Sequence, residues 1–178
     1  MSSQSALTEN PPLVLDATCS WSKVWPKFAT VRIDIRPEAH PDILMDARNL
    51  KFPNAFFDAI YCDPPHIIRK NGNVSAAARI ARLRRGHSDK NFFDRFGLWS
   101  SRAEWLDFLD KTDKEFARCL KPVGLLHYKV TDGEGNSGTK VSEVLERMVS
   151  FTVINDKKTK TGKALGQNIV HWLTMKPK

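Results

Sequence analysis

Short apolar runs that end in acidic residues recur along the first third of the chain. Residues 12–17, 31–35, 42–46 and 56–62 each have the pattern of a buried strand, and four acids, Asp16, Asp34, Asp46 and Asp63, stand at or just after their ends. Short strands separated by spacers that are expected to be helical predict a mainly parallel α/β sheet. Because ligands bind at the carboxyl ends of such strands, the four carboxylates are expected to converge on one crevice.

The second half of the chain predicts two helices and three further strands. Residues 101–120 have apolar side chains at helical spacing, and Ser101 and Glu104 match a capping box. Residues 121–124 are expected to turn the chain into a strand at 125–130, and 141–148 form an amphipathic helix. Strands at 151–154 and 169–175 follow, with the polar stretch 155–168 as the loop of a hairpin. We therefore expect a Rossmann-like α/β fold with a mainly parallel sheet of about seven strands, an antiparallel pair at its end and helices on both faces.

Length and composition indicate one domain. The chain has 178 residues, and we expect a disordered lead at 1–11 and a single domain over 12–178. No apolar stretch approaches the roughly 20 residues that span a bilayer, so no membrane association is expected. Cys19, Cys62 and Cys119 are isolated from one another and show no zinc-ligand spacing. This pattern favours a reducing compartment such as the cytoplasm and predicts no metal site.

The net charge of +8 favours polyanionic partners. Basic residues gather in one segment, with Asp89 as the single acid among them; they are Arg69, Lys70, Arg79, Arg82, Arg84, Arg85 and Lys90. The stretch 76–85 within it has a helical composition, and such a run can simply be a solvated helix face. Its position directly after the fourth predicted strand favours contact with the phosphates of a nucleic acid instead.

Two consecutive prolines follow the fourth predicted strand, in the sequence Asp63-Pro64-Pro65-His66. Proline fixes φ and has no N–H group, so this loop is stiff and its carbonyl oxygens have no donor of their own nearby. A stiff loop at the end of a strand can hold polar atoms in fixed positions. These atoms are candidates for contact with a substrate.

Taken together, these motifs resemble the class I S-adenosylmethionine (SAM)-dependent methyltransferases, and more narrowly the amino-group methyltransferases of nucleic acids. Asp63-Pro64-Pro65-His66 is similar to the [Asp/Asn/Ser]-Pro-Pro-aromatic catalytic motif of that group. Residues 120–125 resemble the turn before the fifth strand, and 171–176 resemble the last strand of small phage-type adenine methyltransferases. The resemblance implies a cofactor site made by the residues Asp16, Ala17, Thr18, Cys19, Asp34, Ile35, Asp46 and Ala47. Within it, Asp34 would bind the ribose, and Asp46 with Ala47 would contact the adenine ring.

The resemblance also implies a chemical role for the proline loop. An exocyclic amino group of a base is a poor nucleophile, because its lone pair is delocalised into the ring. The Asp63 carboxylate and the Pro64 carbonyl would accept its hydrogens, Pro65 would stiffen the loop, and His66 would stack on a base swung out of its helix.

The sequence leaves the substrate open. Adenine N6 in DNA is the first expectation, and an RNA base (guanine N2 or adenine N6) or cytosine N4 is the alternative. A non-catalytic nucleic-acid-binding relative is a third reading, because Ser20-Trp21-Ser22 stands where the family has glycines. Residues 67–100 are the one candidate for a substrate-recognition insertion, and a partner subunit or a homodimer could supply further recognition.

Overall fold

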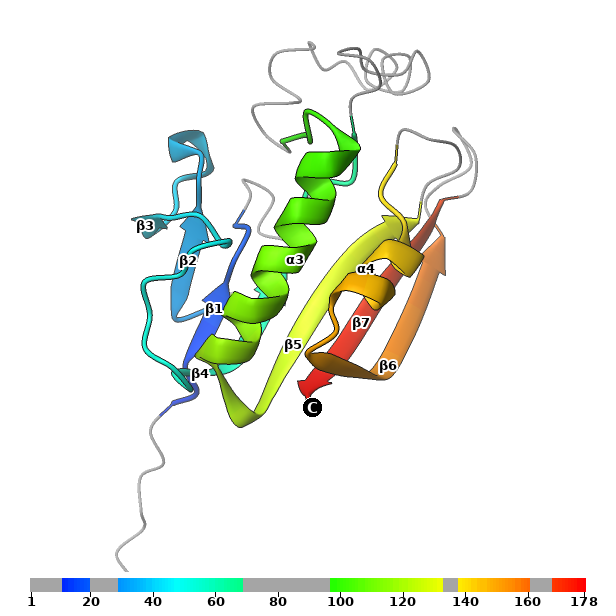
Figure 1. The fold of residues 1–178 in the computed structure, drawn as a ribbon. Helices are drawn as coiled ribbons and strands as arrows, with labels where there is room; N and C mark the ends of the chain where they lie inside the picture. Colours follow the sequence, from blue (N-terminus) through cyan, green and yellow to red (C-terminus); the bar gives the residue numbers. More distant parts are fainter. Residues whose placement is uncertain (1–10, 20–28, 69–96, 133–137, 161–167) are drawn as a thin grey trace, which may run out of the picture.

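The computed structural model describes residues 11–19, 29–68, 97–132, 138–160 and 168–178. Its centre is a seven-stranded sheet of order β3-β2-β1-β4-β5-β7-β6 (Figure 1). The strands are β1 (Val14–Asp16), β2 (Val31–Asp34), β3 (Ile43–Leu44), β4 (Phe57–Cys62), β5 (Leu120–Asp132), β6 (Phe151–Lys160) and β7 (Ile169–Pro177). The first five strands pair in parallel, whereas β7 is antiparallel to both β5 and β6. The predicted α/β sheet with its antiparallel pair is confirmed.

Two α-helices, α3 (Arg102–Cys119) and α4 (Val141–Arg147), lie on the same face of the sheet, in front of it in Figure 1. A short 3-10 helix, η1 (Pro37–Ala39), follows β2. The Ser101 side chain accepts a hydrogen bond from the Glu104 N–H at 3.1 Å, which caps α3 as predicted. The predicted helical stretch at 76–85 lies outside the described residues, so helices on the second face stay a prediction.

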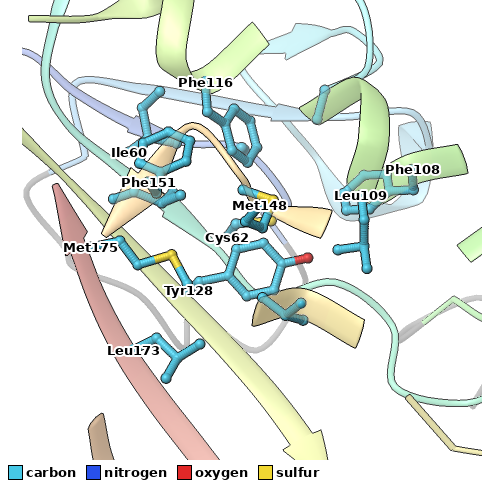
Figure 2. Packing of buried hydrophobic residues seen from close by; sticks show 14 of the residues in the cluster. Ile60, Cys62, Phe108, Leu109, Phe116, Tyr128, Met148, Phe151, Leu173 and Met175 are labelled. Carbon is cyan, nitrogen blue, oxygen red and sulfur yellow. The ribbon is translucent and has the colours of Figure 1, made fainter. Parts of the chain in front are cut away.

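The core lies between the sheet and these two helices. Figure 2 shows Phe116 and Leu109 of α3 in one cluster of buried side chains with Tyr128 of β5, and all three side chains are fully buried. Burial alternates along β5, where Leu126 and Tyr128 are buried but Lys129 is only partly so. Because successive residues of a strand point to opposite faces, Lys129 is on the face away from α3 and α4.

Two segments that were predicted as turns belong to strands in the structure. The hairpin loop predicted at 155–168 is wrong for 155–160, because β6 continues to Lys160 opposite Ile169. Polar residues are acceptable there since β6 is an edge strand, and lysines on an edge discourage further pairing. The turn predicted at 121–124 is a bulge within β5, where the partner of β4 shifts from Leu120 to Leu125.

The described helices include none long and apolar enough to span a membrane. The three cysteines are free and buried.

Candidate active site

A cavity of about 230 Å³ opens at the carboxyl ends of the parallel strands. Ten of the residues that were predicted for the site line it: Ala17, Thr18, Asp34, Ile35, Asp46, Ala47, Asp63, Pro64, Pro65 and His66. Residues from four separate strand ends thus meet at one place, as the acid-ended pattern predicts.

Two predicted cofactor residues, Asp16 and Cys19, do not line the cavity and are almost fully buried. The Thr18 N–H donates to Asp16 Oδ1 at 3.3 Å, and burial raises the pKa of Asp16 to about 6. Burial likewise raises the pKa of the Cys19 thiol to about 12, so this thiol stays protonated. Both side chains therefore shape the turn after β1 and do not form the wall of the cavity.

Asp34, at the end of β2, is bound by an arginine that was not predicted for the site. Arg36 donates from Nε to Asp34 Oδ1 and from a terminal nitrogen to Oδ2, both at 2.9 Å, and its backbone N–H also reaches Oδ1 at 2.9 Å. Gly97, with φ of 67°, lies against the Arg36 guanidinium and Pro65, where a Cβ would come within 2.9 Å of the proline ring. Gly97 thus packs between the Arg36 guanidinium at the end of β2 and Pro65 of the proline loop.

Asp46 repeats this arrangement with Arg48. Arg48 donates from Nε at 3.0 Å and from a terminal nitrogen at 2.8 Å to Asp46 Oδ2. Burial raises the pKa of Asp46, but the hydrogen bonds from Arg48 outweigh it and hold the pKa below its ordinary value. The repeated Asp-x-Arg spacing at 34–36 and 46–48 was a sequence signal that could have identified both arginines.

The proline loop is held by side chains from distant parts of the chain. Its first amide, the Asp63 N–H, donates to Thr18 Oγ1 at 2.6 Å. The indole N–H of Trp99 donates to the Pro65 carbonyl, also at 2.6 Å. These bonds come from the turn after β1 and from the segment before α3, so they fix the loop from two sides.

The Asp63 side chain forms an ion pair with Lys129 of β5, whose Nζ lies 2.6 Å from Asp63 Oδ2. Each side chain is 19% exposed. Burial raises the pKa of Asp63, and the nearby Lys129 ammonium opposes this rise. Lys129 was not among the predicted site residues, although the alternation of apolar and polar residues over 126–130 puts it on the opposite face of β5 from Tyr128.

Two acceptors of the loop remain without a partner within the described part of the chain. No hydrogen bond from the described residues reaches Asp63 Oδ1 or the Pro64 carbonyl oxygen. Asp63 and Pro64 both line the cavity. A charged oxygen and a carbonyl oxygen from adjacent residues can accept both hydrogens of one amino group.

The predicted nucleic-acid contacts Arg69, Lys70, Arg79, Arg82, Arg84, Arg85 and Lys90 all lie outside the described residues. The ends of the predicted insertion at 67–100 are described, and they belong to the body of the domain. Ile68 and Trp99 form a parallel bridge with each other, and both are buried in the core.

Comparison with known proteins places the fold. No protein-family model matches the chain, and no curated protein matches it. A TehB-like SAM-dependent methyltransferase from Corynebacterium glutamicum superposes with a TM-score of 0.56 at 12% identity, over 94% of this chain and 80% of that one. The chain has the fold of the SAM-dependent methyltransferases.

Two further solved structures share this fold. A SAM-dependent methyltransferase from Methanosarcina mazei has a TM-score of 0.53 at 12% identity, over 95% of this chain and 93% of that one. A 1,6-didemethyltoxoflavin-N1-methyltransferase from Burkholderia thailandensis, with S-adenosylhomocysteine bound, has a TM-score of 0.51 at 13% identity, over 94% and 72%. At such identities the likeness concerns the fold, and substrates must be argued from the site.

Proposed function

We propose that this protein is a SAM-dependent methyltransferase that acts on an exocyclic amino group of a nucleic-acid base, with adenine N6 in DNA as the first candidate. The observation that supports this most directly is the pair of acceptors, Asp63 Oδ1 and the Pro64 carbonyl, at the wall of the cavity. The fold shared with solved SAM-dependent methyltransferases and the sequence resemblance of residues 63–66 support it further.

The acceptor pair suits the chemistry of an amino group. When both N–H bonds donate to fixed acceptors, the nitrogen becomes more pyramidal and its lone pair is freed toward the methyl donor. The nitrogen gains positive charge during attack, which the Asp63 carboxylate stabilises. A preorganised contact of this kind is worth about 2.7–4 kcal/mol, or roughly a hundred- to thousand-fold in rate.

The residues around the cavity fit the cofactor. Asp34 is a buried carboxylate that can accept hydrogen bonds from the ribose hydroxyls, and Ile35 offers an apolar side chain that is 62% exposed. Asp46 and Ala47 line the same cavity, and they would contact the adenine ring. The bound cofactor supplies the electrophilic methyl group. Since Arg36 already binds both oxygens of Asp34, it must share or yield this carboxylate when the ribose binds.

The nucleic acid is proposed from charge and from the resemblance. The chain carries a net charge of +8, and the basic residues at 69–90 would contact phosphates. DNA is favoured over RNA by the similarity to phage-type enzymes. An RNA base or cytosine N4 is the alternative target, because the proline motif is shared. A partner subunit or a second copy of the chain could add target recognition.

The test is to incubate the protein with labelled SAM and separate DNA and RNA pools, and to identify the modified nucleoside by mass spectrometry. We expect a methylated amino group in one pool, and a loss of roughly a hundred- to thousand-fold in single-turnover rate for Asp63→Asn. Asp63→Ala should be slower still, while calorimetry shows unchanged SAM binding in both variants. Transfer by Asp63→Ala at the wild-type rate would exclude the proposal. SAM binding by wild-type protein without transfer to either pool would also exclude it.

A further inference from the structure

Lys129 is held at two points beside the proline loop. Its Nζ lies 2.6 Å from Asp63 Oδ2 and 5.3 Å from the centroid of the Trp172 ring. Trp172 is the residue opposite Lys129 in the β5–β7 pair, and its indole N–H donates to Thr159 Oγ1 at 3.1 Å. A long side chain that would otherwise sample many rotamers therefore has a defined place over an aromatic face.

We propose that Lys129 is the positioning residue of this site: it holds Asp63 Oδ2 from β5, so that Asp63 Oδ1 and the Pro64 carbonyl stay directed at the same substrate group. This inference rests on the proposed function, because it assumes that Asp63 is an acceptor. Lys129 itself lines the cavity together with Asp63.

An ion pair that served only to stabilise the fold would have no need to lie at the wall of the cavity, where Asp63 and Lys129 are found. Buried pairs contribute little to stability compared with apolar residues of similar size, because both charges lose their hydration. Exposed pairs also contribute little, because water and salt screen the two charges. The Asp63–Lys129 pair is largely removed from water and stands at the wall of the cavity, so its more direct effect is on the orientation and charge of Asp63.

The electrostatic surroundings of Asp63 make it dependent on Lys129. Asp16 of β1 is a second carboxylate close enough for the two charges to repel. Cys62 and Tyr128 lie near enough to Asp63 for its charge to act on them, but burial raises the pKa of each well above its ordinary value, so both are neutral. Burial raises the pKa of Asp63, and among the described groups Lys129 is the cation that opposes it. Without Lys129, Asp63 would become protonated at higher pH and would present a donor to an amino group that requires an acceptor.

The test compares Lys129→Met and Lys129→Arg with a matched control on the same pair of strands. Lys121 of β5 forms a similar but more exposed ion pair with Asp58 of β4 at 2.8 Å, and neither residue lines the cavity. Single-turnover methyl transfer from SAM to the DNA and RNA pools is measured as a function of pH for each variant. SAM affinity and thermal unfolding are recorded alongside.

For Lys129→Met we expect the acidic limb of the rate profile to move up by about 1–3 pH units, the usual effect of an adjacent opposite charge. Lys129→Arg should restore much of the wild-type profile, because it keeps a cation on the Trp172 ring. Lys121→Met should leave the profile unchanged, and SAM affinity should stay within about twofold in all variants, since Lys129 acts on the acceptor of the substrate. A Lys129→Met profile that coincides with wild type would overturn the proposal.

A second measurement is independent of turnover. The carboxyl pKa of Asp63 is measured by carbon NMR titration in wild-type and Lys129→Met protein without nucleic acid. If wild-type protein methylates neither pool, the proposed function fails, whereas a higher Asp63 pKa in Lys129→Met still supports the hold of Lys129 on Asp63. If the Asp63 pKa is the same in both proteins, Lys129 does not act on the Asp63 carboxylate and the inference is wrong, whatever the activity.

Discussion

Trp99 offers a way to test whether the proline loop must be held from outside. Its indole N–H donates to the Pro65 carbonyl at 2.6 Å, and Trp99 is only 7% exposed. Its ring lies 5.4 Å from that of Trp105 and 4.9 Å from that of Phe108. The Trp99→Phe substitution keeps an aromatic ring in this cluster but removes the donor from the loop.

The expected loss of stability follows from the acceptor left behind. The Pro65 carbonyl is partly buried, so leaving it without its donor costs up to about 1–3 kcal/mol, the range for a fully buried group. In a chain of this length, each kcal/mol lowers Tm by about 2–4 °C, so Tm should fall by roughly 2–12 °C. The loss of methyl-transfer rate should be greater than this loss of stability alone would cause. Pro65 adjoins the Pro64 carbonyl, and a 1 Å displacement of a reacting group can lower the rate about a hundredfold.

Trp105→Phe is the matched control. Trp105 is fully buried in the same aromatic cluster, and its indole N–H donates to Glu143 Oε2 at 2.9 Å, away from the loop. Urea unfolding and Tm give the stability of each variant, and single-turnover methyl transfer is measured where both remain folded. Both variants should be destabilised, but only Trp99→Phe should be slow. Equal rates for Trp99→Phe and wild type, or equal losses in the two variants, would refute the idea that this bond holds the loop for catalysis.

Two further predictions concern the carboxylates of β1 and β2. Asp34→Ala should weaken SAM binding about 10- to 150-fold, because a hydrogen bond to a charged group contributes about 1.5–3 kcal/mol. Calorimetry measures the affinity, and an unchanged value would mean that Asp34 does not bind the cofactor. Burial raises the Asp16 pKa from 3.8 to about 6, so this carboxyl favours folding when protonated and loses that contribution as pH rises through 6. Asp16→Asn should therefore raise the free energy of unfolding by up to about 3 kcal/mol at pH 7–8 and by nothing below the unfolded pKa. Urea unfolding at several pH values measures this difference, and a gain independent of pH would contradict the reasoning.

Local sequence patterns were enough to predict the strands of the parallel half, the helix over 101–120 and the approximate place of the candidate site. These features depend on local information: apolar runs, a Ser cap and prolines that end a strand. Asp34, Asp46 and Asp63 could be assigned to one cavity because the parallel order brings strand ends together. The same rule was wrong for Asp16, whose side chain is buried beneath the turn.

The side chains that hold the proline loop could be identified only from the folded structure. Lys129 binds Asp63 across 66 residues of sequence, and Trp99 binds Pro65 across 34. Neither contact leaves a local pattern, because each depends on how strand pairing and the packing before α3 bring distant segments together. The extension of β6 to Lys160 has the same origin, since a polar stretch becomes a strand only when β7 offers its backbone groups for pairing.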